Sequence, residues 1–441
     1  MTSARAAARG LCAALIAGQA ARAMAQTPAP AETVAAGAGK PQNTQAQGQA
    51  PGGSGLRLGT NGRPTLQLPF GEIQFRGRVA GLVQTPTHDR GADGPEPTWQ
   101  TRRLQIEGTL FTRLEFEVSR EFGDATEPER DAFANLRVNR AFELRAGQFK
   151  LPFGRDALTG GANLDLVTRS LAGRQLAPGR DTGVMVHGRL ARRRVAYQGG
   201  YFTKDGDNAR TSQTRGGRDA LAARVVVSPF VASDRPALAG LQVGAAAMTS
   251  QLEDRLGLRG HTVFEEGVFF NRVFVNGRRL RRGVEAGWGF GPVSLAWEHM
   301  TVSDERLGMG ANGEALPSVK ATGWYVSGAW VLTGERKQGR VEPEHSLFAD
   351  GLGALELVAR VERLAFDAGA DTAAPPAPPL VPPPAANADR VITIGLAWYL
   401  NRYFKINGNA VFESVTDPER SPAPQDGGRF PTAVVQFQVA L

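Results

Sequence analysis

The chain has a single cysteine, Cys12, and it lies within residues 1–25. These residues have the features of a secretory signal peptide, with Arg5 and Arg9 before a short apolar core and Ala23-Met24-Ala25 as a cleavage site. We therefore expect an exported mature chain without cysteine. Such a chain has neither disulfides nor thiol chemistry, and backbone pairing and side-chain packing must hold it together.

Long apolar runs are also missing. Beyond the N-terminus no run of 18 uncharged apolar residues occurs, which excludes helical membrane spans. The five histidines are scattered, and there is no H-E-x-x-H, G-x-S-x-G, phosphate-binding loop or cysteine spacing for a metal. We predict no enzymatic activity and no cofactor or metal. The formal net charge of +8 comes without basic stretches interleaved with aromatics, so no nucleic-acid partner is expected for this exported chain.

A two-residue alternation of apolar and polar side chains is present instead. In the last strand predicted, 430–441, Val435, Phe437 and Val439 fall on one face, and Gln436 and Gln438 fall on the other. A strand with these two faces lies between an apolar and an aqueous environment. The wall of a membrane barrel requires this pattern, with lipid outside and water inside.

The same alternation recurs in about sixteen segments, most of them near the ~9–11 residues with which a tilted strand crosses a bilayer. They are 72–84, 99–107, 110–122, 132–140, 142–149, 181–190, 194–203, 218–228, 240–250, 280–290, 292–302, 320–333, 353–366, 389–400, 403–413 and 430–441. We predict an all-β fold, a transmembrane antiparallel up-and-down β-barrel over 72–441. A disordered or extended periplasmic leader, 26–71, would precede it, because 26–55 has almost no large apolar side chains.

The connections alternate in length: those after odd-numbered strands are long, and most after even-numbered strands are short. Outer-membrane barrels have long external loops and short periplasmic turns, so both termini are expected on the periplasmic side. Two connections, 229–239 and 334–352, are too long for tight turns, which leaves the strand count open by one hairpin. Residues 372–386 hold seven prolines and predict a stiff external loop.

The long connection 150–180 is rich in basic residues and is expected to fold into the barrel, where it would narrow the water path. Its candidate anion-binding residues are Lys150, Arg155, Arg169, Arg174 and Arg180. Arg and Lys side chains around a narrow channel select anions. The alternative is that several of these residues pair with Asp156, Asp165 and Asp181 or face external water.

Basic side chains on the water-facing side of the strands extend this candidate path. They are Arg76, Arg78, Arg137 and Arg145, which could form a ladder of guanidinium groups. Acids of the same parity, Glu72, Glu115, Glu117 and Glu143, support the alternative of a neutralised, water-lined wall.

A compact basic cluster follows the long connection 251–279. It comprises Arg278, Arg279, Arg281 and Arg282. If the connection folds inward, this cluster would capture anions at the channel mouth; the alternative is a solvated rim.

Seven stretches, spread in order over 72–441, carry a resemblance to a known family. They are Phe75-Arg76-Gly77-Arg78, Gly147-Gln148-Phe149-Lys150-Leu151-Pro152-Phe153-Gly154, Thr168-Arg169-Ser170, Pro178-Gly179-Arg180-Asp181-Thr182-Gly183, Arg282-Gly283-Val284-Glu285-Ala286, Trp324-Tyr325 followed by Leu332-Thr333-Gly334-Glu335, and Trp398-Tyr399-Leu400-Asn401. Together they resemble the phosphate-selective porin family, also called the porin O and P family.

The resemblance implies a trimeric outer-membrane barrel that passes phosphate, polyphosphate or other small anions. Only Lys150, Arg155, Arg169 and Arg180 lie on matched stretches and inherit a role from it. Lysine is scarce after Lys150, which disfavours a phosphate site built from lysines.

We therefore expect a passive channel for small anions in the outer membrane of a Gram-negative cell, with lipid and two further copies of the chain as partners. The alternative is a loop-plugged barrel that serves as an envelope scaffold or adhesin without significant conductance.

Overall fold

A computed structural model describes residues 55–59, 62–85, 97–123, 129–206, 218–264, 267–310, 312–337, 339–369, 386–419 and 428–441. The expected signal peptide, most of the expected leader and most of the proline-rich segment 372–386 lie outside these residues. Within them, no helix is long and apolar enough to cross a membrane.

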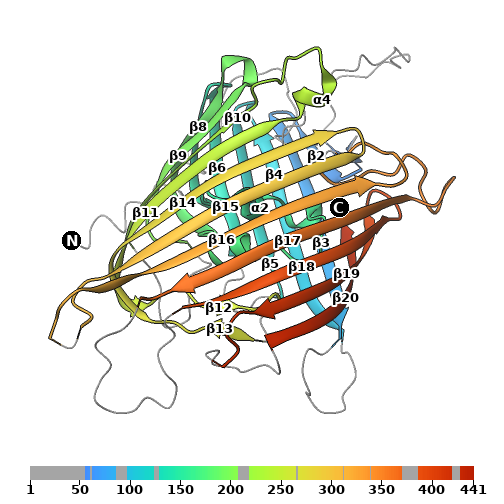
Figure 1. The fold of residues 1–441 in the computed structure, drawn as a ribbon. Helices are drawn as coiled ribbons and strands as arrows, with labels where there is room; N and C mark the ends of the chain where they lie inside the picture. Colours follow the sequence, from blue (N-terminus) through green and yellow to red (C-terminus); the bar gives the residue numbers. More distant parts are fainter. Residues whose placement is uncertain are drawn as a thin grey trace.

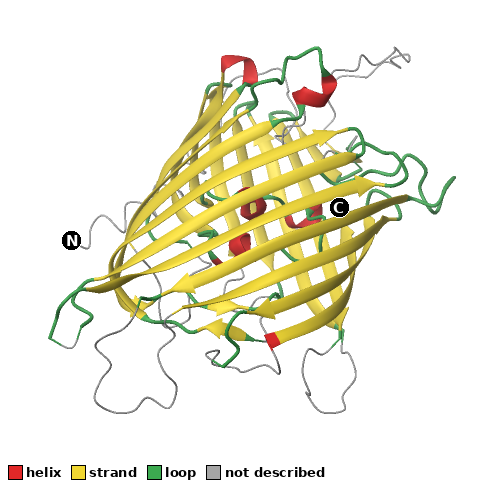
Figure 2. Cartoon of the chain, viewed as in Figure 1, coloured by secondary structure: helices red, strands yellow, loops and turns green. Residues whose placement is uncertain are grey.

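The strands form a closed antiparallel barrel of sixteen strands (Figures 1 and 2), which confirms the predicted fold class. They are β3 (Gly71–Gln84), β4 (Thr98–Leu110), β5 (Leu114–Glu121), β6 (Glu129–Asn139), β7 (Phe142–Lys150), β8 (Arg180–Leu190), β9 (Val195–Phe202), β10 (Arg218–Val227), β11 (Gln242–Leu256), β14 (Phe274–Phe290), β15 (Val293–Arg306), β16 (Leu316–Val331), β17 (Ala354–Asp367), β18 (Ala386–Tyr399), β19 (Phe404–Val415) and β20 (Arg429–Ala440). Pairing of β20 with β3 closes the barrel, with Val439 opposite Val79. No strand edge of the wall is left open, as a bilayer requires.

The alternation in the sequence places apolar side chains outside. On β20, Val435 and Phe437 are exposed on the outer surface, whereas Gln436 and Gln438 are buried inside. Every second residue of β18 likewise exposes an apolar side chain, among them Ile392, Ile394 and Leu396. The barrel therefore has an apolar outer belt and a polar interior.

The last part of the expected leader is ordered. It forms β1 (Gly55–Leu58) and β2 (Pro64–Leu68), a hairpin whose second strand pairs with the first residues of β3. β20 pairs with β3 only from Arg78 onward. The hairpin strand β2 pairs instead with the first residues of that edge, 71–74. Alternating leucines, at positions 56, 58, 66 and 68, favour these short strands over a disordered chain.

The two connections that exceed the length of a tight turn add no hairpin. The first contains the short helix α4 (Pro236–Ala239). The first part of the second, 332–353, turns into the barrel, where Val341 is buried among side chains that include Val331 and Tyr399, whereas Phe348 and Leu352 near its end are exposed. Its Lys337 Nζ lies 2.5 Å from Asp165 and 2.6 Å from Glu356. Burial lowers the pKa of Lys337, but the two carboxylates outweigh burial and hold that pKa above its ordinary value.

The connection between β7 and β8, residues 151–179, lies inside the barrel (Figure 2), and we call it the inner loop. It contains α2 (Arg155–Leu158), the 3-10 turn η1 (Gly161–Asn163) and α3 (Leu171–Gln175). The connection between β11 and β14 also turns inward. It carries the short strands β12 (Gly260–His261) and β13 (Val268–Phe270), and Phe270 stacks on Phe366 with ring centroids 4.7 Å apart.

Acidic side chains of the wall hold the inner loop by its backbone N–H groups. The Glu298 carboxylate of β15 accepts hydrogen bonds from the N–H groups of Arg155 and Asp156, at 2.6 and 3.3 Å. Glu362 of β17 accepts one from Leu171 at 2.5 Å. Because a buried backbone donor without a partner is costly, these carboxylates fix the position of both helices.

Basic and amide side chains of the same wall bind the rest of the inner loop. Lys405 and Arg360 donate to the carbonyl oxygens of Leu164 and Thr168, at 2.6 and 3.0 Å. The Asn409 Oδ1 accepts from the Val167 N–H at 2.8 Å. The inner loop is thus bound mainly to the wall formed by β14–β19, and a cavity separates much of it from the opposite wall, β3–β8.

The outward face of β5 offers a test of the apolar belt. We expect Val118→Arg to lower the free energy of unfolding by up to about 2–4 kcal/mol, because its exposed side chain would place a charge in lipid. Urea unfolding in lipid vesicles, followed by tryptophan fluorescence, measures the change. The control is Gln105→Arg on the inward face of β4, for which a much smaller loss is expected; equal losses would contradict the assigned faces.

A second test concerns the anchoring of the inner loop. Glu298→Leu leaves the N–H groups of Arg155 and Asp156 without acceptors, at about 1–3 kcal/mol each. We expect trypsin to cleave the folded variant within 151–179 about tenfold faster or more than the parent protein. Glu305→Leu changes an outward carboxylate of the same strand and should leave this cleavage rate unaltered. Full protection of the Glu298 variant would show that this carboxylate is dispensable for holding the loop.

Candidate functional site

The candidate site is the space that the inner loop leaves along β3–β8. It is a cavity of about 920 Å³ between this wall and the loop. Nine basic side chains line it: Arg76, Arg78, Arg103, Arg130, Arg145, Lys150, Arg169, Arg174 and Arg180. Five acidic side chains do so as well: Glu72, Glu107, Glu115, Glu117 and Asp131. Basic groups therefore outnumber acidic ones around this cavity.

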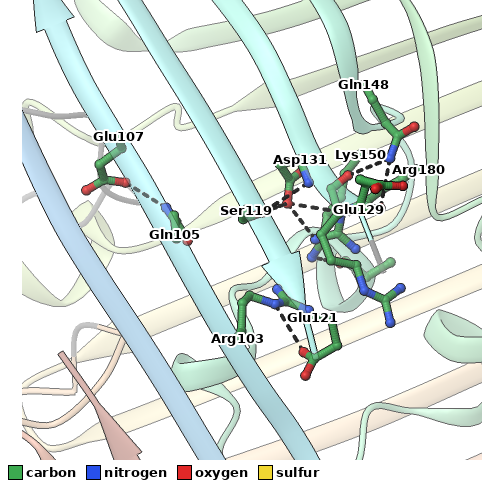
Figure 3. A network of polar contacts seen from close by, with 12 residues as sticks. Arg103, Gln105, Glu107, Ser119, Glu121, Glu129, Asp131, Gln148, Lys150 and Arg180 are labelled. Atoms are coloured by element: carbon green, nitrogen blue, oxygen red, sulfur yellow. Dashed lines mark hydrogen bonds and ion pairs between the residues drawn. The ribbon is translucent and has the colours of Figure 1, made fainter. Parts of the chain in front are cut away.

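Several of the basic groups are neutralised by acids on nearby strands. Arg180 donates to Asp131 at 2.9 Å, and Asp131 in turn is held by Ser119 (Figure 3). Figure 3 also shows Arg103 with Glu121, at 3.3 Å. Arg76 lies 3.1 Å from Glu107. These pairs line the cavity without adding net charge.

Three basic groups instead contact only uncharged oxygens among the described residues. Arg78 donates to the Gln438 side chain at 3.0 Å. The Lys150 ammonium donates to the backbone oxygens of Ala157 and Thr159, at 2.5 and 3.2 Å. We call Arg78, Lys150 and Arg169 the cationic triplet.

Arg169 completes the triplet from the inner loop. It donates to the carbonyl oxygens of Asp156 and Thr159. Burial lowers the pKa of its guanidinium, which nevertheless stays protonated at neutral pH. The charges of Lys150 and Arg169 interact, as do those of Arg78 and Arg169, so three basic groups lie close together where the loop faces β3–β8.

Arg145 is held differently from the other cavity-lining bases. Its guanidinium lies over the Phe133 ring, 4.3 Å from the centroid. The ring supports the cation without cancelling its charge.

Seven of the nine residues predicted for the anion path line this cavity. Arg155 and Arg137 do not. Arg155 points to β11 and β14, with its Nη1 3.5 Å from Gln242. Arg137 is paired with both Glu115 and Glu143 and belongs to the neutralised wall.

The basic cluster predicted at the channel mouth does not form one patch. Arg279 and Arg281 are buried on the inner face of β14, and Arg278 and Arg282 are exposed on its outer face. Successive residues of a strand point to opposite faces, so a run of arginines is split between two environments. Arg279 is paired with Asp205 at 2.7 Å and Asp304 at 2.5 Å. Arg281 donates to the Leu176 carbonyl oxygen at 3.0 Å and holds the inner loop.

Sequence reasoning missed Arg103 and Arg130 as cavity-lining residues. Arg103, Gln105 and Glu107 are every second residue of β4 and face inward together, so the alternation in the sequence could have identified Arg103. It also missed the wall residues that hold the inner loop, such as Glu298 and Glu362. Their inward parity is visible in the sequence, but their partner on a distant loop is not.

Among the residues that the structure describes, no group of three or more His, Cys, Asp or Glu side chains is arranged to hold a metal ion.

Solved structures with the same fold are outer-membrane proteins. An anion-selective porin from Comamonas acidovorans superposes with a TM-score of 0.52 at 14% identity, over 84% of this chain and 100% of the other. The channel DcaP of Acinetobacter baumannii gives 0.54 at 11% identity, over 84% and 98%. The trimer form of OmpT from Vibrio cholerae gives 0.53 at 11%, over 84% and 100%. At these identities the likeness establishes the fold alone.

No curated protein sequence matches the chain. A family model does match it, that of phosphate-selective porin O and P, over residues 88–441. This match covers most of the chain and agrees with a barrel of sixteen strands around a cavity lined by polar and charged side chains. The chain therefore belongs to the phosphate-selective porin O and P family, and it is a channel-type protein of the Gram-negative outer membrane.

Proposed function

We propose that the protein is a passive channel for small anions, with phosphate as the lead candidate. The observation that carries the proposal is the cationic triplet, Arg78, Lys150 and Arg169, whose charges meet at the cavity without a carboxylate partner among the described residues. A positive field in a narrow space with low-dielectric walls attracts anions and repels cations.

The path works through groups of two kinds. The paired arginines, such as Arg180 with Asp131, keep the wall hydrated and hold it in place. The triplet supplies the net attraction, and its donors replace part of the hydration shell of a passing anion. The binding stays weak because the donors are shared with Gln438 and loop carbonyls, so the anion leaves again.

Phosphate recognition would depend on arginine more than on lysine. Lys150 is the one lysine among the cavity-lining side chains, beside eight arginines. The planar guanidinium binds phosphate oxygens in pairs, which suits this composition. The family's description as phosphate-selective and the anion-selective porin among the structural neighbours support the same preference.

Three further expectations belong to this proposal. The chain would be exported by its signal peptide, assemble as a homotrimer as the trimer form of OmpT does, and catalyse no reaction. The rival function is a loop-plugged barrel that serves as a scaffold or adhesin without significant conductance. The cavity beside the inner loop favours the channel.

Reversal potentials in planar bilayers under a KCl gradient test anion selectivity. We expect the parent protein to prefer chloride, and Arg78→Gln to reduce the chloride-to-potassium permeability ratio about two- to fivefold, because one charge is removed from the path. Arg120→Gln is the control: Arg120 lies on β5 and pairs with Glu129 away from the cavity. A cation-selective parent channel would refute the proposal, and absent conductance would favour the scaffold.

Phosphate block of the chloride current tests the preferred anion. Phosphate added at constant ionic strength should reduce the single-channel chloride current in a saturable manner, because it occupies the triplet for longer. Lys150→Gln should weaken this block, and Lys320→Gln, on the outer face of β16, should not. A chloride current that phosphate leaves unaltered would exclude phosphate as the preferred anion while leaving anion selectivity intact.

A further inference from the structure

A line of polar side chains crosses the outer face of the barrel on β16–β20. Consecutive partners in the strand pairing are Trp324, Arg363, Arg390, Ser414 and Arg429. All five have the outward parity of their strands, and Arg390 and Arg429 are exposed. We call Arg363, Arg390 and Arg429 the arginine row.

Among the described residues, the three charges of the arginine row have no acidic partner. Arg363 and Arg390 are direct cross-strand partners, and like charges in that position destabilise a sheet. In the described part of the chain, none of the three makes a side-chain hydrogen bond or ion pair.

Two other outward arginines near the long-loop rim, Arg120 and Arg278, are paired with acids. Arg120 lies 3.6 Å from Glu129 on the next strand. Arg278 lies 3.4 Å from Glu305. The charges of the row, which have no acidic partner among the described residues, differ from these two pairs and are available to an anion from outside the chain.

The row lies at one border of the apolar belt. On the side of the short turns, the next outward residues are Val361, Ile392 and Phe412, all exposed and apolar. On the other side, Arg429 is the first residue of β20, at the rim of the long loops. In outer-membrane barrels the long loops face outward from the cell, so this border meets the headgroups of the outer leaflet. Trp324, at the end of the line, is the residue type that gathers at such interfaces.

We propose that the arginine row binds phosphate groups on the lipid headgroups of the outer leaflet. Guanidinium groups bind phosphate oxygens in pairs, and the Ser414 hydroxyl between Arg390 and Arg429 adds a donor. Neighbouring strands are about 4.8 Å apart, so Arg429 lies about 10 Å along the sheet from Arg390. This spacing suits a headgroup with two phosphates. The proposal is independent of the anion path, which lies inside the barrel.

The test uses the full-length protein in detergent and lipid A carrying two phosphates as the probe. Binding is measured by native mass spectrometry and by thermophoresis, with dephosphorylated lipid A for comparison. We expect the diphosphorylated form to bind the parent protein about tenfold tighter or more, and the double variant Arg363→Gln/Arg390→Gln to lose this difference. The control Arg120→Gln should retain it.

Three results would overturn the proposal. In one, the parent protein binds both forms of lipid A equally. In another, inorganic phosphate competes with lipid A at equal concentration, which would assign the row to a soluble anion. In the third, the double variant binds lipid A like the parent but changes its oligomeric state, which would assign the row to contact between copies. The heat-induced shift in gel mobility confirms beforehand that each variant is folded.

Discussion

The structure depends on one constraint: backbone N–H and C=O groups placed in lipid or in a crowded barrel must find hydrogen-bond partners. Pairing of β20 with β3 meets this constraint for the wall, because it leaves no open strand edge among the sixteen. The inner loop has little regular structure and meets it through side chains of the wall. Glu298 and Glu362 accept from its N–H groups, and Lys405 donates to one of its carbonyls.

Charged residues inside the barrel therefore have two different roles. Those on β14–β19 are largely used to bind the loop, so charges such as Arg281 and Arg360 are unavailable to a permeating ion. Those on β3–β8 face the cavity. In the function that we propose, the few cations that lack an acid beside them therefore attract anions along one side of the bore.

The sequence predicted the wall well because its signal is local. All sixteen predicted segments overlap barrel strands, since the two-residue alternation in a stretch such as 430–441 follows directly from the two environments of the wall. Prediction was weaker where a residue's role depends on the face of the strand that it occupies or on a contact with a distant segment. Arg279 and Arg282 are three residues apart, yet one is buried in an ion pair and the other faces outward. Arg155 directly follows a stretch that resembles the family, but its backbone N–H is bound by a wall glutamate and its side chain does not line the cavity.

The ion pairs of Lys337 join parts of the chain that begin at opposite rims. Lys337 comes from a connection on the short-turn side, whereas its partner Asp165 belongs to a loop that enters from the long-loop side. Glu356 of β17 fastens both to the wall. One ammonium group thus links a connection from one rim to the inner loop from the other, so a displacement of either segment would strain the ion pairs of Lys337.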